Sequence, residues 1–251
     1  MSEKIYEYPK SINDTATHYC AGCGHGIVHK LLAQCLDELD IAGETLLVAP
    51  VGCSVLAYNY LKVDGLEAAH GRAPAVATGL KRVHKDKIVV SYQGDGDLLA
   101  IGTAETIHAA NRGEKITILF INNAIYGMTG GQMAPTSLEN QVTMTSPRGR
   151  DVGDVGYPIR ACELINTLEK PYYIERCSVH DVKSINKTKK AIKKALTCQK
   201  EGLGYSFVEI LSMCPTNWGM DPVKAVEWLE NSMIPYYPLK VFRDKGVKAD
   251  A

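Results

Sequence analysis

Several features that would mark whole classes of protein are missing from this sequence of 251 residues. Its 28 lysines and arginines are balanced by 28 acidic residues, so it lacks the positive field that non-specific nucleic-acid binding requires. No apolar run approaches the roughly 18 residues of a membrane helix, and the first residues lack the basic patch and apolar stretch of a secretory signal. We therefore expect a cytoplasmic protein with neither a nucleic-acid nor a membrane partner.

Internal repeats, low-complexity tracts and polar linkers are also missing. Their absence predicts one main domain, which we place over residues 1–232. Eight cysteines occur without a secretory signal, and reducing compartments keep thiols free, which argues against a disulfide framework. Some of these cysteines are instead candidate metal ligands.

Apolar runs that resemble buried strands alternate with helical patterns. The strand-like runs are too continuous for a sheet with one face in water, which favours a parallel sheet. They cover residues 45–51, 87–92, 115–122, 172–179 and 205–211. Helical patterns cover residues 24–37, 72–84, 98–112, 181–201 and 222–230. The alternation predicts an α/β fold with a doubly wound, mostly parallel sheet, whose functional groups gather at the carboxyl ends of the strands.

Two segments do not fit a minimal fold of this kind. Residues 127–158 are rich in Gly, Thr, Pro and Ser, and such a long loop after a strand is expected to be functional. Residues 233–251 contain Pro235, Pro238 and several aromatic side chains. We expect them to form an extended C-terminal tail without helix, which lies on a partner subunit or back across this chain.

Polar residues follow two of the predicted strands. The run Gly94-Asp95-Gly96-Asp97 opens a helix, where glycines permit a sharp turn and backbone amides point towards a phosphate. Asn122-Asn123 ends the next strand, one strand-to-strand crossover later. Each motif alone is common in turns and loops, but together they indicate a diphosphate bridged by Mg²⁺ between Asp95 and Asn123. Asp97 either faces the bound group or begins the helix with a favourable charge.

Four cysteines can meet near the same edge of the sheet. Cys20 and Cys23 have the two-residue spacing that lets both thiolates reach one metal or cluster. Cys53 and Cys214 each follow a predicted strand, so four thiolates are available, as a [4Fe-4S] cluster requires.

The cysteine pattern alone leaves alternatives open. These are a redox-active pair, a zinc site completed by His18 or His25, and small buried apolar residues. The other four cysteines fall inside predicted helices or strands and are expected in the core: Cys35, Cys162, Cys177 and Cys198.

Five motifs follow one another in a specific order. They are His18-Tyr19-Cys20-Ala21-Gly22-Cys23-Gly24-His25, Val51-Gly52-Cys53-Ser54, His70-Gly71-Arg72-Ala73-Pro74-Ala75, Gly94-Asp95-Gly96-Asp97 and Asn122-Asn123-Ala124-Ile125-Tyr126-Gly127-Met128-Thr129-Gly130-Gly131-Gln132. Together they resemble the β subunit of 2-oxoacid:ferredoxin oxidoreductases, over residues 15–220. The resemblance implies a thiamine-diphosphate-binding fold that works with an α subunit and, in many relatives, with γ and ferredoxin-like subunits.

The resemblance also implies three sets of site residues. Magnesium would be held by Asp95, Asn123 and the backbone carbonyl of Ile125, and a [4Fe-4S] cluster by Cys20, Cys23, Cys53 and Cys214. Contacts to thiamine diphosphate would come from Val51, Gly52, Cys53, Ser54, His70, Gly94, Gly96, Asp97, Gly127, Met128 and Thr129. The glutamate that activates the cofactor is expected from a partner subunit, so no catalytic side chain is assigned here.

The implied reaction is the CoA-dependent oxidative decarboxylation of a 2-oxoacid, with electrons passed to ferredoxin. The substrate would be 2-oxoglutarate or a branched-chain 2-oxoacid such as 2-oxoisovalerate. Leu56 stands where some relatives carry a lysine that meets the substrate carboxylate, so that carboxylate must be held elsewhere, for example by the α subunit. The alternatives are a non-oxidative thiamine-diphosphate decarboxylase or carboligase subunit and a noncatalytic zinc-binding interaction module.

Overall fold

Seven strands form one sheet in the order β2-β1-β3-β4-β6-β5-β7 in this computed structural model, which describes residues 6–246. Neighbouring strands run parallel, except that β7 is antiparallel to β5. The strands are β1 (Thr45–Pro50), β2 (Asp64–Ala68), β3 (Ile88–Gly94), β4 (Thr117–Asn122), β5 (Tyr173–Ser178), β6 (Ser206–Leu211) and β7 (Lys240–Asp244).

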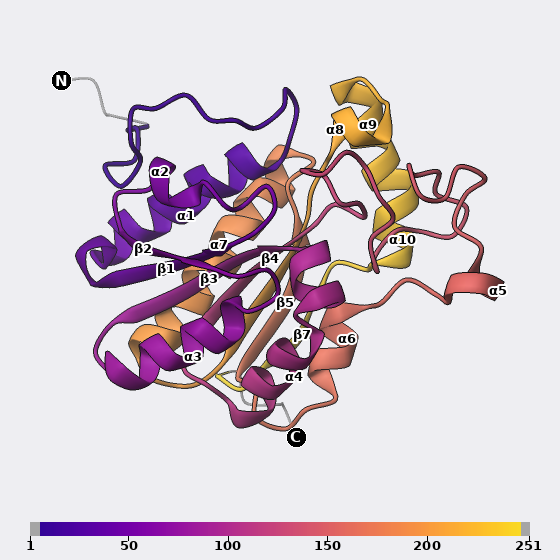
Figure 1. Cartoon of the computed structure of the whole chain (residues 1–251). Coiled ribbons are helices and arrows are strands. Elements are labelled where there is room, and N and C mark those ends of the chain that lie inside the picture. The colour runs from indigo at the N-terminus through magenta and orange to yellow at the C-terminus, as the bar shows by residue number, and fades with distance from the viewer. Residues whose placement is uncertain (1–5, 247–251) are drawn as a thin grey trace.

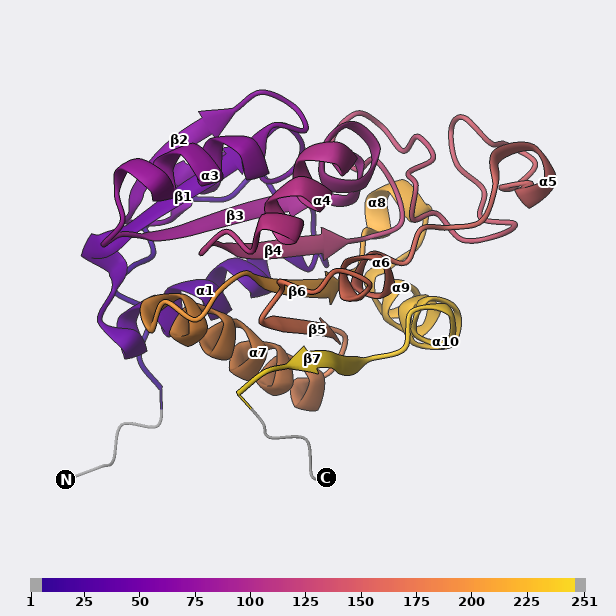
Figure 2. The ribbon, with the colours of Figure 1, turned by 90° about the horizontal axis from the view of Figure 1, so that it is seen from below.

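Helices cover both faces of the sheet (Figures 1 and 2). One face packs against α1 (His25–Leu39) and α7 (Val182–Lys200), and the other against α3 (Ala73–Val83), α4 (Thr103–Arg112) and α6 (Ala161–Asn166). Short helical turns complete the fold: η1 (Ala42–Glu44), α2 (Ala57–Tyr60), η2 (Gly96–Ile101), α5 (Val152–Val155), α8 (Pro215–Trp218), α9 (Pro222–Trp228), η3 (Leu229–Met233) and α10 (Ile234–Tyr236). The predicted doubly wound, mostly parallel sheet is confirmed.

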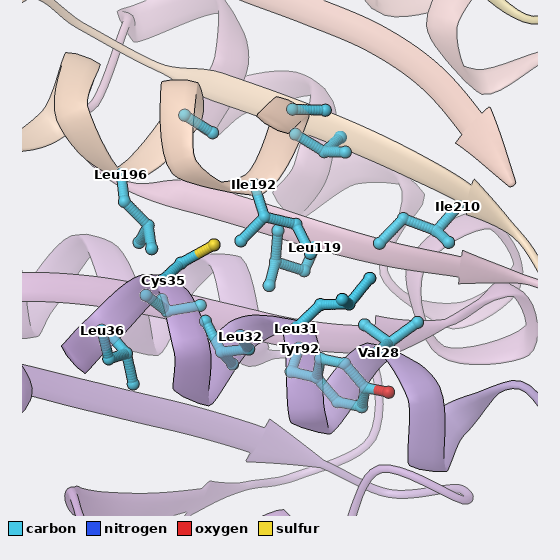
Figure 3. Packing of buried hydrophobic residues seen from close by; sticks show 14 of the residues in the cluster. Val28, Leu31, Leu32, Cys35, Leu36, Tyr92, Leu119, Ile192, Leu196 and Ile210 are labelled. Carbon is cyan, nitrogen blue, oxygen red and sulfur yellow. The ribbon is translucent and has the colours of Figure 1, made fainter. Parts of the chain in front are cut away.

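The two cores follow from the alternation of side chains along each strand. On β4, Leu119 and Ile121 belong to the α1–α7 core, whereas Ile118 and Phe120 belong to the core beneath α3 and α4. Figure 3 shows the first core, in which Leu119 lies between side chains of α1 and α7. Both faces of the strand are therefore apolar, which is why its sequence reads as a continuous apolar run.

The helix expected over residues 98–112 is not continuous. A wide turn, η2, begins directly after Asp95, and α4 begins only after Gly102. Gly102 lies against the backbone of Gly71, and a Cβ at residue 102 would come within 2.6 Å of the Gly71 carbonyl oxygen. The close approach of these two backbones therefore requires a glycine at position 102.

The edge strand β2 was not predicted. Four of its five residues are exposed, and its sequence, Asp-Gly-Leu-Glu-Ala, contains no apolar run. Its backbone hydrogen bonds to β1 define it, and a hydrophobicity pattern cannot report them.

The C-terminal tail expected from Met233 was predicted to contain no helix, and that prediction is wrong. Helical turns continue without a break from α9 through Tyr236, and Pro235 follows the wide turn η3, in which the Ile234 N–H reaches back to the Leu229 carbonyl. The chain then folds back and adds β7 to the sheet. Residues 247–251 of the expected tail lie outside the described residues.

The strand order places a crevice at the carboxyl ends of β1 and β3. The chain passes from β1 outwards to β2 and then returns to β3 on the other side of β1, and ligands of open α/β sheets bind at such a switch. The segment between β4 and α6 lies beyond these strand ends, as do α8 and α9 (Figure 1). None of the helices in the described residues has both the length and the apolar character needed to cross a bilayer.

A buried ion pair holds the last strand in place. Arg176 on β5 donates to Glu209 on β6 at 2.8 Å and to Glu163 on α6 at 2.5 Å, and both Arg176 and Glu209 have fully buried side chains. The guanidinium also lies over the ring of Phe242 on β7, 5.0 Å from its centroid.

Replacement of Arg176 by methionine should lower the free energy of unfolding by about 3–5 kcal/mol, because Glu209 is left buried without its cation. Chemical denaturation measures this loss. The control is Lys189→Met, which breaks a partly exposed pair with Glu38 and should cost less than about 1 kcal/mol. Equal losses in the two variants would contradict the role given to Arg176.

Candidate functional site

The loops that follow four parallel strands line one pocket of about 90 Å³. Residues 51–53 follow β1, His70 follows β2, residues 94–97 end and follow β3, and residues 123–129 follow β4. All the residues predicted to contact thiamine diphosphate line this pocket except Ser54, whose buried hydroxyl donates back to the Pro50 carbonyl at 3.4 Å. His25 and Tyr126 also line the pocket and were not predicted.

The predicted magnesium ligands lie close together in the wall of this pocket. The backbone N–H of Ile125 lies 3.2 Å from Oδ2 of Asp95 and 3.3 Å from Oδ1 of Asn123, so both side-chain oxygens point to the same place. Burial raises the pKa of Asp95 to about 6, although hydrogen bonds from Thr136, Gly96 and Ile125 oppose the rise. A bound cation would compensate the buried carboxylate, so these oxygens fit the hard-ligand set of Mg²⁺.

The segment expected to form a functional loop supports this carboxylate. Thr136 donates its hydroxyl to Oδ2 of Asp95 at 2.6 Å, and Tyr237, from the C-terminal segment, donates to the Thr136 carbonyl at 2.7 Å. The buried guanidinium of Arg150 donates to the carbonyls of Ala134 and Ser137, on either side of Thr136. The loop is thus fixed in place by hydrogen bonds to its own backbone.

Asp97 contributes to the pocket less directly than Asp95 does. One of its oxygens accepts from Nδ1 of His70 and from the N–H of Gly71, both at 2.6 Å, and the other accepts from Gln93 at 2.6 Å. All the side-chain oxygens of Asp97 are engaged within the protein. Asp97 therefore positions His70, which itself lines the pocket.

A second cavity, of about 310 Å³, is lined by Cys20, Cys23, Cys53 and Cys214. The first two precede α1, the third follows β1 and the fourth follows β6, so the fold brings together thiols from distant parts of the sequence. The other four cysteines lie buried in the cores, as expected: Cys35, Cys162, Cys177 and Cys198.

The four thiols surround a space rather than a point. Among the described residues, no three His, Cys, Asp or Glu side chains converge on a position for a single metal ion. His18 and His25, the candidates to complete a zinc site, bond through Nδ1 to the hydroxyls of Tyr60 and Tyr92, each at 2.7 Å, and His18 also lines the cysteine cavity. A cavity of about 310 Å³ lined by four thiols has room for a polynuclear cluster.

Burial and mutual repulsion disfavour charged thiolates at Cys23, Cys53 and Cys214 when no cation is bound. Burial, together with repulsion from the neighbouring cysteines, raises the pKa of Cys23 and of Cys53 to about 12 each. Burial also raises the pKa of Cys214, whereas hydrogen bonds from Asn217 lower it. The cavity thus fits a positively charged group that stabilises thiolates, as iron does.

The two cavities share a wall. Cys53, Asn123, Gly127 and Met128 line both of them. At Gly127, a Cβ would lie 3.3 Å from Sγ of Cys53 and 3.6 Å from Sγ of Cys214, so its backbone closely approaches both sulfurs. Groups bound in the two cavities would be separated only by this thin layer.

Three residues that hold the site were missed by the sequence analysis: Thr136, Asn217 and Trp218. Trp218 donates from Nε1 to the Asn123 carbonyl at 3.0 Å. Thr136 lies in a loop without periodicity, and the other two lie on the four-residue helix α8. The sequence placed Cys214 and the loop 127–158 after strands, but no local pattern shows which of their side chains bond to the site.

Fold and site together define a thiamine-pyrophosphate-binding domain, and residues 50–210 match the family model described as the thiamine pyrophosphate enzyme, C-terminal TPP binding domain. The chain is 35% identical to 2-oxoglutarate synthase subunit KorB of Methanocaldococcus jannaschii, over 86% of this chain and 78% of the relative. It belongs to the family of 2-oxoacid:ferredoxin oxidoreductase subunits, and the predicted resemblance is confirmed.

Two other comparisons bear on the chain. It is 50% identical, over its whole length, to ketoisovalerate oxidoreductase subunit VorA of Methanothermobacter thermautotrophicus, and it spans 54% of that relative's length. A structure titled 2-oxoglutarate:ferredoxin oxidoreductase from Magnetococcus marinus superposes with a TM-score of 0.77 at 24% identity, over 99% of this chain and 87% of the other. At that identity the superposition supports the fold alone.

Replacement of Thr136 by valine should weaken the retention of Mg²⁺ and thiamine diphosphate about tenfold, because Asp95 loses the hydroxyl that fixes its orientation. Calorimetric titration measures the affinity. Thr197→Val serves as the control, since the Thr197 hydroxyl bonds only to a carbonyl within α7. Unchanged affinity in Thr136→Val would show that Asp95 needs no support from the loop.

Proposed function

We propose that this chain is the β subunit of a 2-oxoacid:ferredoxin oxidoreductase and carries thiamine diphosphate, Mg²⁺ and one [4Fe-4S] cluster. The reaction is the oxidative decarboxylation of a 2-oxoacid with CoA, which yields an acyl-CoA and CO₂ and delivers two electrons, one at a time, to ferredoxin. The observation that carries the proposal is the wall shared by the pocket that contains Asp95 and Asn123 and the cavity that contains four cysteines.

The shared wall favours an oxidative enzyme over the two alternatives. A non-oxidative decarboxylase or carboligase would use Asp95 and Asn123 but would have no need of four thiols beside them. A zinc-binding interaction module would use the thiols without the neighbouring pocket. When bound, thiamine diphosphate supplies the carbanion chemistry and the cluster a one-electron acceptor.

Individual side chains of this chain hold and orient those groups. The oxygens of Asp95, Asn123 and the Ile125 carbonyl would hold Mg²⁺, and residues 51–54, 94, 96, 97 and 127–129 with His70 would surround the cofactor. Cys20, Cys23, Cys53 and Cys214 would hold the cluster. Gly127 has no side chain, so the layer that its backbone forms between the two groups stays thin enough for electron transfer.

The pocket is incomplete without a partner. No glutamate lines it in the described part of the chain, so the carboxylate that activates thiamine diphosphate must come from another subunit. Val51 and Met128 at its mouth are 36% and 47% exposed, as apolar side chains at an interface with another chain would be. We infer that an α subunit covers this face, with γ and ferredoxin-like subunits in the same complex.

A branched-chain 2-oxoacid is the substrate that fits best. No lysine or arginine lines either cavity in the described residues, so this chain offers no cation for the second carboxylate of 2-oxoglutarate. Leu56, where some relatives carry a lysine, adds no charge either. The relative named for ketoisovalerate is also more similar, at 50% identity, than the one named for 2-oxoglutarate, at 35%.

Replacement of Asp95 by alanine should lower the affinity for thiamine diphosphate and Mg²⁺ at least about tenfold, because a direct ligand is lost. Iron and acid-labile sulfide should remain at the level of the unaltered protein, since Cys20, Cys23, Cys53 and Cys214 are untouched. Asp86→Ala, at an exposed position, is the control. Retention of thiamine diphosphate by Asp95→Ala would refute its role, and zinc in place of iron in the unaltered protein would favour the interaction module.

Anaerobic purification with the partner chains, followed by viologen reduction with CoA, tests the substrate. We expect kcat/KM for 2-oxoisovalerate to exceed that for 2-oxoglutarate at least about tenfold, since an unpaired second carboxylate is costly to bury. The chain alone should show no turnover with either substrate, because the activating glutamate is missing. A preference for 2-oxoglutarate would overturn the substrate assignment but not the reaction class.

A further inference from the structure

One side-chain amide connects the two cavities. Nδ2 of Asn217, on α8, donates to the Gly127 carbonyl oxygen at 2.8 Å and to Sγ of Cys214 at 3.6 Å. An amide nitrogen carries two hydrogens, so both contacts can be made at once. Asn217 thus bonds to a backbone that faces the thiamine pocket and to a sulfur that faces the cysteine cavity.

The chemistry of the acceptors fixes the orientation of this amide. Its two partners, a carbonyl oxygen and a thiol or thiolate sulfur, both accept hydrogen bonds. If the amide were reversed, its oxygen would face two acceptors, and both interactions would become repulsive. The orientation with nitrogen towards Gly127 and Cys214 is therefore the stable one.

A donor at a cluster sulfur changes the redox equilibrium as well as the geometry. The positive end of an N–H dipole stabilises negative charge on the sulfur, and a reduced cluster carries one negative charge more than the oxidised form. The hydrogen bond therefore stabilises the reduced form more and raises the reduction potential. Low local polarity strengthens the effect, and Cys214 is 7% exposed.

We propose that Asn217 is a positioning residue that raises the reduction potential of the cluster and holds the Gly127 backbone against it. The proposal rests on the proposed function, because it needs a cluster bound by Cys214. Asn217 touches neither a substrate nor a reacting atom in this arrangement. It acts through the sulfur and the carbonyl that accept its two hydrogens.

The test compares reduction potentials in the complete complex, purified anaerobically with its partner chains. The signal to follow by electron paramagnetic resonance is the one that Cys214→Ala abolishes. In Asn217→Leu, which has a similar size but no donor, we expect a more negative midpoint potential with unchanged iron content. Thiamine diphosphate should also bind more weakly, because the Gly127 carbonyl loses its partner.

Two further variants separate the donor from the shape of the side chain. Asn217→Gln keeps the amide and should recover most of the shift in potential, whereas a purely structural role would make it no better than Asn217→Leu. Asn186→Leu, at an exposed position on α7, should leave the potential unchanged. If purified Asn217→Leu contains no iron, Asn217→Ala replaces it, because alanine removes the donor with less bulk. Its midpoint potential is measured in the same way, and the same negative shift is expected.

The outcomes distinguish this proposal from the proposed function. An unaltered protein that contains no iron refutes both. Suppose instead that the unaltered protein contains iron and thiamine diphosphate, and that Asn217→Leu has the reduction potential of the unaltered protein. This result refutes the role of Asn217 but not the proposed function. A shift in Asn217→Gln as large as that in Asn217→Leu also overturns it.

Discussion

A buried carboxylate joins the ends of two neighbouring strands, and the geometry of the site depends on it. Asp95, directly after β3, accepts the backbone N–H of Ile125 after β4 and the hydroxyl of Thr136. Without these donors, a charged group in this environment would be costly, because burial favours its neutral form. The same hydrogen bonds orient the oxygens of Asp95 towards the side-chain oxygen of Asn123. They therefore stabilise the fold and set the geometry of the site at the same time.

The layer between the two cavities explains why one chain would hold both cofactors. Groups bound in the two cavities would lie close together because residue 127 is a glycine, and a Cβ there would already lie 3.3 Å from the Cys53 sulfur. Asn217 and Trp218 fix this layer from α8 through the carbonyls of Gly127 and Asn123. The cysteine that follows β6 and the helix after it therefore contribute to the architecture of the thiamine pocket as well as to the cysteine cavity.

The C-terminal segment illustrates how tertiary contacts overrule local composition. Proline and aromatic residues predicted an extended tail, yet helical turns continue through Pro235 to Tyr236, and the buried hydroxyl of Tyr237 donates to the Thr136 carbonyl in the loop that supports Asp95. The strand β7 then pairs with β5 around Arg176. Arg176 and Phe242 are 66 residues apart in the sequence, and no local pattern records such a contact.

The sequence by itself determined the parallel sheet and most of the pocket. Strands buried on both faces need continuous apolar runs, and the turns after them need glycine, acidic and amide residues, so β1, β3 and β4 and the positions of Asp95 and Asn123 could be read from local patterns. Only the tertiary structure decided which distant segments meet. Hydrogen bonds between distant parts of the chain fix the positions of Thr136, Asn217 and the edge strand β2. The distance in sequence between the bonded residues follows no helical or strand periodicity, so only packing of the whole fold determines these positions.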